Sequence, residues 1–266
     1  LQLKIQIQKQ YNIDIELGSI LANPTVLQFA HSLDGITDRK ISSIVKRDNG
    51  TVQKLSPQQI RMWILSNNAD TAGAYNITGF FRFKKEVDIH ALAKSVALLI
   101  KKHEILRTCF YEKNGEPFQV VNDTVEVNIP EIQTDDISSA VTFALEQEKN
   151  FSFDLSQSPL FRITVIKDNS GNTVLVINCH HIITDGWSLK IMMNELSLFY
   201  DKFCTGEEIS IEEPLLQYSD YCAWLDDESL KDGFKEAENY WKKIIASDND
   251  VTSLPRDFNN TEEQNH

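Results

Sequence analysis

Two adjacent histidines and an aspartate close behind them carry the clearest chemistry in this sequence. His180 and His181 follow an apolar run over residues 173–179, and Asp185-Gly186 begins four residues after His181. Histidine is the side chain whose ordinary pKa lies near neutrality, so it can take up and release a proton at physiological pH. Neighbouring side chains on a strand point to opposite faces, so we do not expect both rings to face one site. We expect His180 to be structural.

The elements that must position these residues follow from the spacing of the apolar side chains. Alternation favours strands, and a spacing of three or four residues favours helices. The sequence predicts strands over 77–83, 106–111, 117–121, 161–167 and 173–179. It predicts helices from Ser56-Pro57 onward and over 88–102, 137–149, 188–203 and 236–245. Asn114-Gly115 and residues 170–172 are typical hairpin turns, so we expect a mixed unit of helices and strands.

Composition limits the partners of the chain. The sequence has 39 acidic and 26 basic residues, a net charge of −13, and no run of Lys or Arg. Nucleic acids and anionic membranes need clustered cations, so we expect neither as a partner. No apolar stretch approaches the ~20 residues that span a bilayer. Four widely spaced cysteines favour reduced thiols in a cytoplasm over disulfides or structural zinc: Cys109, Cys179, Cys204 and Cys222.

The first part of the chain has a different pattern. Residues 1–38 predict a small helical unit, whose second helix is opened by Asn23-Pro24-Thr25. Proline in the first turn of a helix loses no internal hydrogen bond. Residues 39–54 are polar and weakly periodic, which predicts a linker, and residues 55–266 form the second unit. After Ser247 the acidic, Asn-rich sequence predicts an exposed tail.

Five stretches of the second unit carry recognisable patterns in a fixed order. They are Ser56-x-x-Gln59-x-Arg61-x-Trp63, residues 102–110 (KHEILRTCF), Phe153-Asp154-Leu155 with Pro159-Leu160-Phe161-Arg162, His180-His181-x-x-x-Asp185-Gly186, and residues 218–224 (YSDYCAW). Together they resemble the SxxQxRxW, RHExLRTxF, HHxxxDG and YxDYAxW motifs of condensation domains in nonribosomal peptide synthetases, and the segment between the second and third of them. That family forms peptide bonds between thioester-bound amino acids. Five matches in family order over residues 55–241 leave little room for coincidence.

The resemblance implies a fold for the second unit. A condensation domain resembles two chloramphenicol-acetyltransferase-like lobes, each an α+β sandwich of the α/β class, with the active site between them. This chain covers the first lobe, and the motifs of the second lobe are absent from the sequence. Both lobes line the substrate tunnel, and positional errors near 1 Å can cost ~100-fold in rate. We therefore expect little or no activity from this chain alone.

The resemblance also implies roles for the site residues. His181 becomes the active-site histidine, which acts on the attacking amine either as a general base or as a group that positions it and stabilises charge. Asp185 is expected to form a salt bridge with Arg107 and so to brace the histidine loop rather than carry a proton. Gly186 permits a tight turn and close approach of the backbone to substrate, and its N–H could face the thioester oxyanion.

The residues around the third motif narrow the subtype. Trp187-Ser188 after Asp185-Gly186 favours a peptide-bond-forming domain over an epimerization domain. Heterocyclization domains lack both motif histidines, and the first motif lacks the pattern of domains that accept a D-configured donor. We therefore expect an L-donor condensation domain. The other histidines have no second ligand at metal spacing and are interpreted as incidental: His31, His90 and His103.

The N-terminal unit carries a weaker resemblance. Pro24-Thr25-Val26-Leu27 and Phe29-Ala30 fit the last helix of a peptidyl carrier domain, and residues 11–15 fit the turn before it. A carrier before a condensation domain is the expected order in a synthetase. The resemblance implies substrates on the 4′-phosphopantetheine arms of upstream and downstream carriers, together with a second condensation lobe and an adenylation domain. The attachment serine is not in this chain, and no metal is expected.

Two other functions stay open. One is a freestanding transferase that moves an acyl group from coenzyme A to a small acceptor, against which the carrier-like N-terminus and the accessory motifs argue. The other is a non-catalytic fragment that docks carriers or acts as a gatekeeper. The intact His181 and Asp185 argue against a decayed site.

Overall fold

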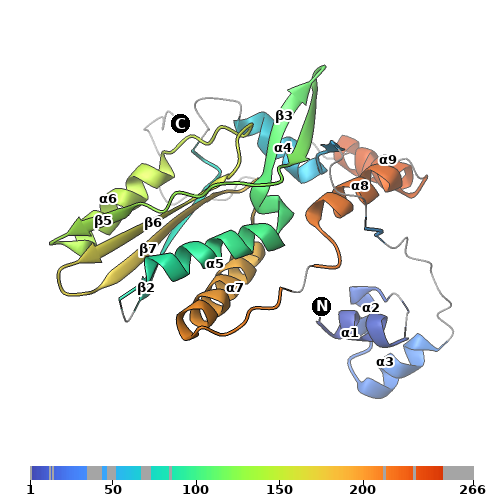
Figure 1. The fold of residues 1–266 in the computed structure, drawn as a ribbon. Coiled ribbons are helices and arrows are strands. Elements are labelled where there is room, and N and C mark those ends of the chain that lie inside the picture. Colours follow the sequence, from blue (N-terminus) through green and yellow to red (C-terminus); the bar gives the residue numbers. More distant parts are fainter. Residues whose placement is uncertain are drawn as a thin grey trace, which may run out of the picture. The chain divides into compact units, whose positions relative to one another are not determined.

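The chain divides into two compact units, residues 1–46 and residues 47–266 (Figure 1). The computed structural model describes residues 2–11, 13, 15–34, 44–46, 52–66, 73–83, 86–211, 214–229 and 232–247. Most of the predicted linker over 39–54 and the predicted tail after Ser247 lie outside the described residues. The linker prediction was wrong at its end, because Gln53 and Lys54 pair with another strand.

The first unit is helical. Its elements are α1 (Gln2–Tyr11), α2 (Leu17–Ala22) and α3 (Val26–Leu33). The Thr25 side chain accepts a hydrogen bond from the Gln28 N–H at 3.3 Å, so α3 begins after Thr25 and Pro24 precedes the cap. Helix α2 was not predicted, since six residues are too few to show a helical period. Ile15, just before α2, is buried.

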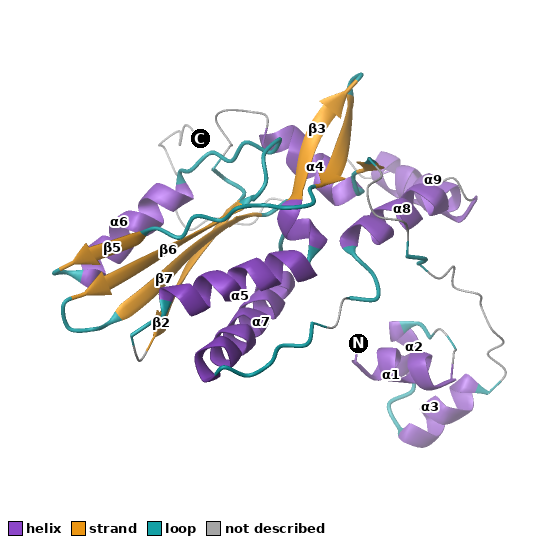
Figure 2. Ribbon diagram, viewed as in Figure 1, coloured by secondary structure: helices purple, strands orange, loops and turns teal. Residues whose placement is uncertain are grey.

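A four-stranded sheet forms the centre of the second unit (Figure 2). Its order is β2-β7-β6-β5, with β2 (Asn76–Phe83), β7 (Thr173–His180), β6 (Phe161–Asp168) and β5 (Glu131–Thr134). β2, β7 and β6 are antiparallel neighbours, while β5 runs parallel to β6. Every residue of β7 is buried, which requires that both faces of the sheet be covered.

Helices cover both faces. The helices are α5 (Ile89–Lys102), α7 (Gly186–Thr205) and α6 (Ile137–Lys149). Leu175 and Ile177 of β7 belong to the larger core, which holds the buried side chains of α5 and α7. Val174 and Val176 pack instead with the buried side chains of α6. Strand β7 therefore sends its odd-numbered residues to one core and its even-numbered residues to the other.

The described part of this unit also contains a smaller sheet and further helices. The sheet has the order β1-β4-β3, with β1 (Gln53–Lys54), β4 (Glu116–Val121) and β3 (Thr108–Lys113). The helices are α4 (Pro57–Ser66), α8 (Tyr218–Ser229) and α9 (Asp232–Ser247). Asn114 and Gly115 have φ values of 57° and 83°, as the predicted hairpin turn requires. In the described part of the chain, no helix is both long and apolar enough to cross a membrane.

The predicted helices and strands of this unit are confirmed, with small shifts at their ends. Helix α5 starts after Asp88, whose carboxylate accepts from the N–H groups of His90 and Ala91 as an N-cap does. The strand predicted from residue 106 begins only at Thr108. Residues 104–107 form a 3₁₀ turn, η2 (Glu104–Arg107), and the Thr108 hydroxyl donates to the Glu104 carbonyl at 2.8 Å.

Candidate active site

A pocket of about 610 Å³ lies beside the C-terminal end of β7. Its wall comes from the start of α4, residues 103–106, the loop 181–185, the first turns of α7, and residues 214–221. Four of the sequence motifs contribute to that wall. The volume lies in the range of pockets that hold small organic ligands.

His180 points into the protein interior and is 1% exposed. Its Nδ1 accepts from the Ile182 N–H at 3.1 Å, and its Nε2 lies 3.1 Å from the Ser66 hydroxyl oxygen. Because Nδ1 accepts, a neutral ring carries its hydrogen on Nε2 and donates it to Ser66. Burial, and then the neighbouring His181, lowers the pKa of His180 to about 4. The ring is therefore neutral at physiological pH and supports the loop.

His181 has different surroundings. Its backbone N–H donates to the Tyr75 carbonyl at 2.8 Å, and its side chain lines the pocket. Its Nδ1 is buried and has no hydrogen-bond partner among the described residues. No described neighbour therefore fixes the tautomer of His181, in contrast to His180. The backbone of this histidine is held by Tyr75, and no described residue forms a hydrogen bond with Nδ1 of its ring.

Asp185 caps helix α7. Its Oδ1 accepts from the N–H and from the hydroxyl of Ser188, both at 2.7 Å. These bonds hold the pKa of Asp185 below its usual range, and the nearby His181 adds a smaller lowering. The side chain is exposed, so the local cap satisfies the carboxylate without a distant cation.

Arg107 has other partners, so the predicted ion pair between Asp185 and Arg107 was wrong. The guanidinium lies 3.6 Å from the carboxylate of Glu104 in the same 3₁₀ turn and donates to the Asn122 carbonyl at 2.5 Å. Both groups of the expected pair lie in the described part of the chain. Arg107 thus fastens η2 to the end of β4.

Gly186 is the first residue of α7. A Cβ at this position would meet no atom within 4 Å, and its φ is not in the left-handed region. The backbone conformation at the start of α7 therefore does not itself require glycine at this position. Close approach of a substrate to this backbone stays a prediction.

The structure places three residues of the second motif in the pocket wall: His103, Ile105 and Leu106. His103 lines the pocket, and its Nε2 lies 2.5 Å from the Glu195 carboxylate, which also accepts from Lys102 at 2.8 Å. Burial raises the pKa of Glu195, but the bonds from His103 and Lys102 outweigh it and leave the pKa low. His103 was not predicted as a site residue, because it has no second ligand at metal spacing in the sequence. Its place within a motif was the available signal.

The first and fourth motifs meet at the pocket wall, which Gln59 and Tyr218 line. The Ser56 hydroxyl lies 3.0 Å from the Tyr218 hydroxyl, and the Cys222 thiol donates to Gln59 Oε1 at 3.4 Å. Gln59 is buried and also accepts from the Ser56 N–H at 3.1 Å. These contacts join the start of α4 to α8, which accounts for both motifs through support of the wall.

Metal ligands and disulfides do not gather at this site. In the ranges that the structure describes, no three His, Cys, Asp or Glu side chains could hold a metal ion together. The four cysteines, all of them described, are free thiols. Burial raises the pKa of Cys179 to about 12, so this thiol stays protonated and unreactive.

Comparison with known proteins decides the family. The family model described as "Condensation domain" matches residues 49–266. The chain belongs to this family. The resemblance to condensation domains of nonribosomal peptide synthetases is thereby confirmed for the second unit.

Curated relatives of this condensation-domain chain are large synthetases. It is 31% identical to bacitracin synthase 3 of Bacillus licheniformis over 95% of the chain and 4% of that protein. It is 30% identical to surfactin synthase subunit 2 of Bacillus subtilis (strain 168) over 97% of the chain and 7% of that protein. The chain thus spans only a small part of the length of these relatives.

Solved structures support the fold of this condensation domain. The starter condensation domain of rhizomide synthetase RzmA matches 73% of the chain and 48% of its own length, with a TM-score of 0.66 and 18% identity. The X-domain from teicoplanin biosynthesis matches 82% of the chain and 48% of its own length, with a TM-score of 0.71 and 22% identity. The α/β class and the chloramphenicol-acetyltransferase-like fold are therefore confirmed.

Proposed function

We propose that this chain forms the histidine-bearing lobe of a domain that makes amide bonds in nonribosomal peptide synthesis. The donor is an acyl or peptidyl thioester and the acceptor an aminoacyl thioester, both held on carrier domains. The observation that carries the proposal is the placement of His181. Its backbone is fixed by Tyr75 and its ring lines a pocket of about 610 Å³.

The proposed reaction joins the acceptor amine to the donor carbonyl. The C–N bond forms, the C–S bond breaks, the amine loses one proton, and the donor arm leaves as a thiol. A neutral imidazole beside the amine can take that proton, or it can orient the amine and stabilise developing charge. His181 fits either role, since no described group fixes its tautomer. The N–H of Gly186, in the first turn of α7, is proposed to face the oxyanion.

Asp185 is proposed as a support of the site rather than a proton carrier. Asp185 lies four residues beyond His181, and its carboxylate holds the first turn of α7 by accepting hydrogen bonds from Ser188. The chain thus braces the loop 181–185 at one end through Tyr75 and at the other through this cap. His180 and Arg107 support the neighbouring elements.

The partners follow from the same proposal. The pocket wall combines apolar side chains such as Met62, Ile191 and Leu216 with the amides of Gln58 and Gln217, which suits an arm of methylenes and amides. We propose that the 4′-phosphopantetheine arms of upstream and downstream carriers bind along this pocket wall. We also propose that residues 1–38 belong to a carrier domain.

The remainder of the synthetase enters the proposal as well. We propose a second condensation lobe and an adenylation domain as partners, an L-configured donor, and a cytoplasmic location. This chain matches 48% of the length of each of the two solved structures named above. A pocket wall from one lobe supports little turnover alone, since positioning dominates the rate of such reactions.

The test uses the full-length protein that contains this chain. An upstream carrier is loaded with an aminoacyl thioester and a downstream carrier with an acceptor, and intact-mass spectrometry measures dipeptide on the downstream carrier. His181→Ala is expected to lower dipeptide formation by ~100-fold or more. His90→Ala, which removes an exposed imidazole on α5, serves as the matched control.

Each other outcome points elsewhere. Equal dipeptide from wild type and His181→Ala would remove His181 from the chemistry. Carrier binding with no dipeptide from the wild type would favour a docking or gatekeeping fragment. Acyl transfer from coenzyme A to a small acceptor would favour the freestanding transferase. A pH profile of kcat then separates a base, whose loss removes one ionisation, from a positioning group.

A further inference from the structure

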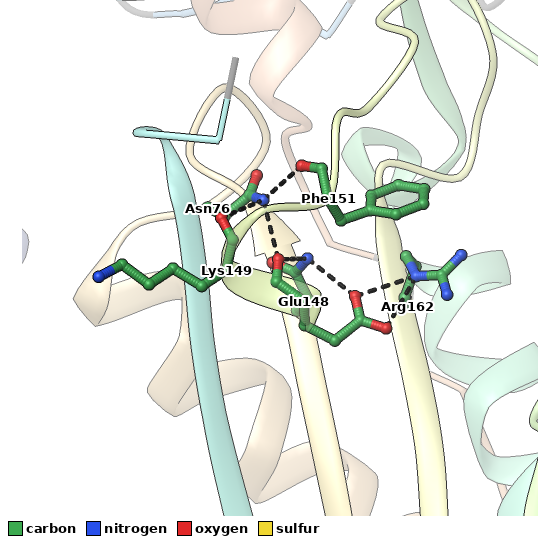
Figure 3. Close-up of polar contacts among 6 residues, drawn as sticks. Asn76, Glu148, Lys149, Phe151 and Arg162 are labelled. Carbon is green, nitrogen blue, oxygen red and sulfur yellow. Dashed lines mark hydrogen bonds and ion pairs between the residues drawn. The ribbon is translucent and has the colours of Figure 1, made fainter. Parts of the chain in front are cut away.

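The C-terminal end of α6 is fastened to the strand end that carries the two histidines. The Asn76 amide nitrogen donates to the carbonyl oxygens of Glu148, Lys149 and Phe151, at 3.0, 3.3 and 2.7 Å (Figure 3). The last carbonyls of a helix have no partner within the helix. Here a side chain at the start of β2 supplies that partner, so the sheet itself caps α6.

A second side chain from the sheet reaches the same helix end. The Asn178 amide donates to the Glu148 carbonyl at 2.8 Å and to its carboxylate at 3.0 Å. That carboxylate also accepts from Arg162 Nε at 3.0 Å, as Figure 3 shows, and the Arg162 guanidinium lies 4.1 Å from the Phe151 ring centroid. Glu148 is buried, so these hydrogen bonds and the Arg162 guanidinium must compensate for the loss of water around its carboxylate.

These contacts adjoin the backbone of the histidines. Asn76 is the register partner of His180, and the Tyr75 carbonyl accepts the His181 N–H. Asn178 lies two residues before His180 on β7. The segment just before β2 lies close to the C-terminal end of α6, since a Cβ at Gly73 would lie 2.7 Å from the Lys149 carbonyl oxygen.

The other end of α6 lies at the far end of the sheet. β5 runs parallel to β6 and ends opposite Asp168, at the hairpin end, and α6 begins there. Asp136 caps this end by accepting from the N–H groups of Ser138 and Ser139 at 3.1 Å. Side chains thus cap both ends of α6, and the end that Asn76 caps is the one that adjoins the histidines.

We propose that Asn76 and Glu148 are positioning residues for His181. Neither is among the residues that line the pocket, so they act through the backbone. They hold residues 75–76 and 178–180 in place, and the ring of His181 keeps its aim into the pocket. The inference rests on the proposed function, because it assigns the reacting group to His181.

The experiment compares the two caps of the same helix in the full-length protein. Asn76→Ala and Asp136→Ala each remove one cap of α6, so both are expected to lower the melting temperature. Asn76→Ala is expected to lower kcat for dipeptide formation ~10-fold or more, with KM within about twofold of wild type. Asp136→Ala is expected to keep kcat near wild type. Equal kcat values for the two variants would overturn the proposal.

Amide hydrogen exchange at His181 tests the positioning without depending on turnover. The proposal expects exchange ~10-fold faster in Asn76→Ala and unchanged in Asp136→Ala, since only the first loosens the bond to Tyr75. Unchanged exchange in both would overturn it. If the wild type forms no dipeptide, the proposed function fails while this measurement still decides the positioning. Should Asn76→Ala not fold, Glu148→Gln takes its place in both comparisons.

Discussion

The two faces of strand β7 end in different environments, one at the pocket and the other in a buried polar cluster. The odd-numbered face runs through Leu175, Ile177 and Cys179 in the larger core, and the next odd position, His181, lines the pocket. The even-numbered face starts with Val174 and Val176 against α6. It then becomes polar, with Asn178 and His180 both buried and hydrogen-bonded.

This difference separates chemistry from support along a single strand. The even-numbered face ends in groups whose nitrogens have partners, and His180 is kept neutral by burial. The odd-numbered face ends in an imidazole whose Nδ1 has no partner among the described residues. A side chain can react only if the fold leaves it some bonding capacity, and its neighbours must then supply the rigidity.

The first prediction tests how unequal the two cores are. Leu175→Ala should lower the free energy of unfolding by about 2–5 kcal/mol, because it opens a cavity in the larger core. Val176→Ala, on the opposite face, removes two carbons from the smaller core and should cost about 2 kcal/mol. Urea unfolding of both variants measures the difference. An equal or reversed order would show that the α6 face contributes as much stability as the α5 and α7 face.

Periodic patterns predicted the elements that build both faces. Helix α6 has the bounds that the sequence indicated, and α5 starts at the predicted cap because a short polar side chain precedes a long apolar period. Helix α2 and strands β1 and β5 were missed, since so few residues hold too little pattern to distinguish a helix or strand from a loop. Helix α8 was missed as well, although its residues were recognised as a motif.

The polar contacts of the even-numbered face could not be predicted. Asn76 and Glu148 are 72 residues apart in the sequence, and no local pattern connects them. The ion pair expected between Asp185 and Arg107 failed for a related reason. Asp185 accepts from Ser188, and Arg107 lies beside Glu104. A sequence motif does not show which of several possible partners a charged group will contact.

The second prediction concerns acid sensitivity of the even-numbered face. The pKa of His180 is about 4 in the folded protein, whereas an unfolded histidine titrates near 6.5. As pH falls from about 6.5 to about 4, the histidine is protonated in the unfolded state but stays neutral in the folded state. This difference in proton binding shifts the equilibrium toward unfolding. About 3 kcal/mol of stability should disappear over this range.

Urea unfolding across that range checks the sign. His180→Gln removes the ionisable ring, so its stability should fall less steeply than that of wild type between pH 6.5 and 4. His103→Gln is the matched control, because it removes an imidazole at the pocket instead. Parallel curves for wild type and His180→Gln would contradict a neutral, buried His180.

The third prediction sharpens the account of the loop that joins the two faces to α7. Asp185→Ala should lose about 1 kcal/mol as an N-cap, while Asp185→Asn keeps the accepting oxygen and should lose less. The losses from Asp185→Ala and Arg107→Ala should add within about 0.5 kcal/mol in the double variant, since the two side chains have separate partners. A larger coupling energy would restore the ion pair between them.

The smallest predicted effect on stability is at Gly186, and it divides structure from chemistry most directly. Gly186→Ala meets no atom within 4 Å and needs no left-handed backbone, so it should stabilise the fold by about 0.4–1 kcal/mol. Thermal unfolding measures that gain. If the backbone of Gly186 must approach the thioester, the added methyl should lower kcat in the same variant. A stabilised variant with unchanged kcat would mean that neither the fold nor the reaction needs glycine here, and His181 would then act without the proposed oxyanion contact.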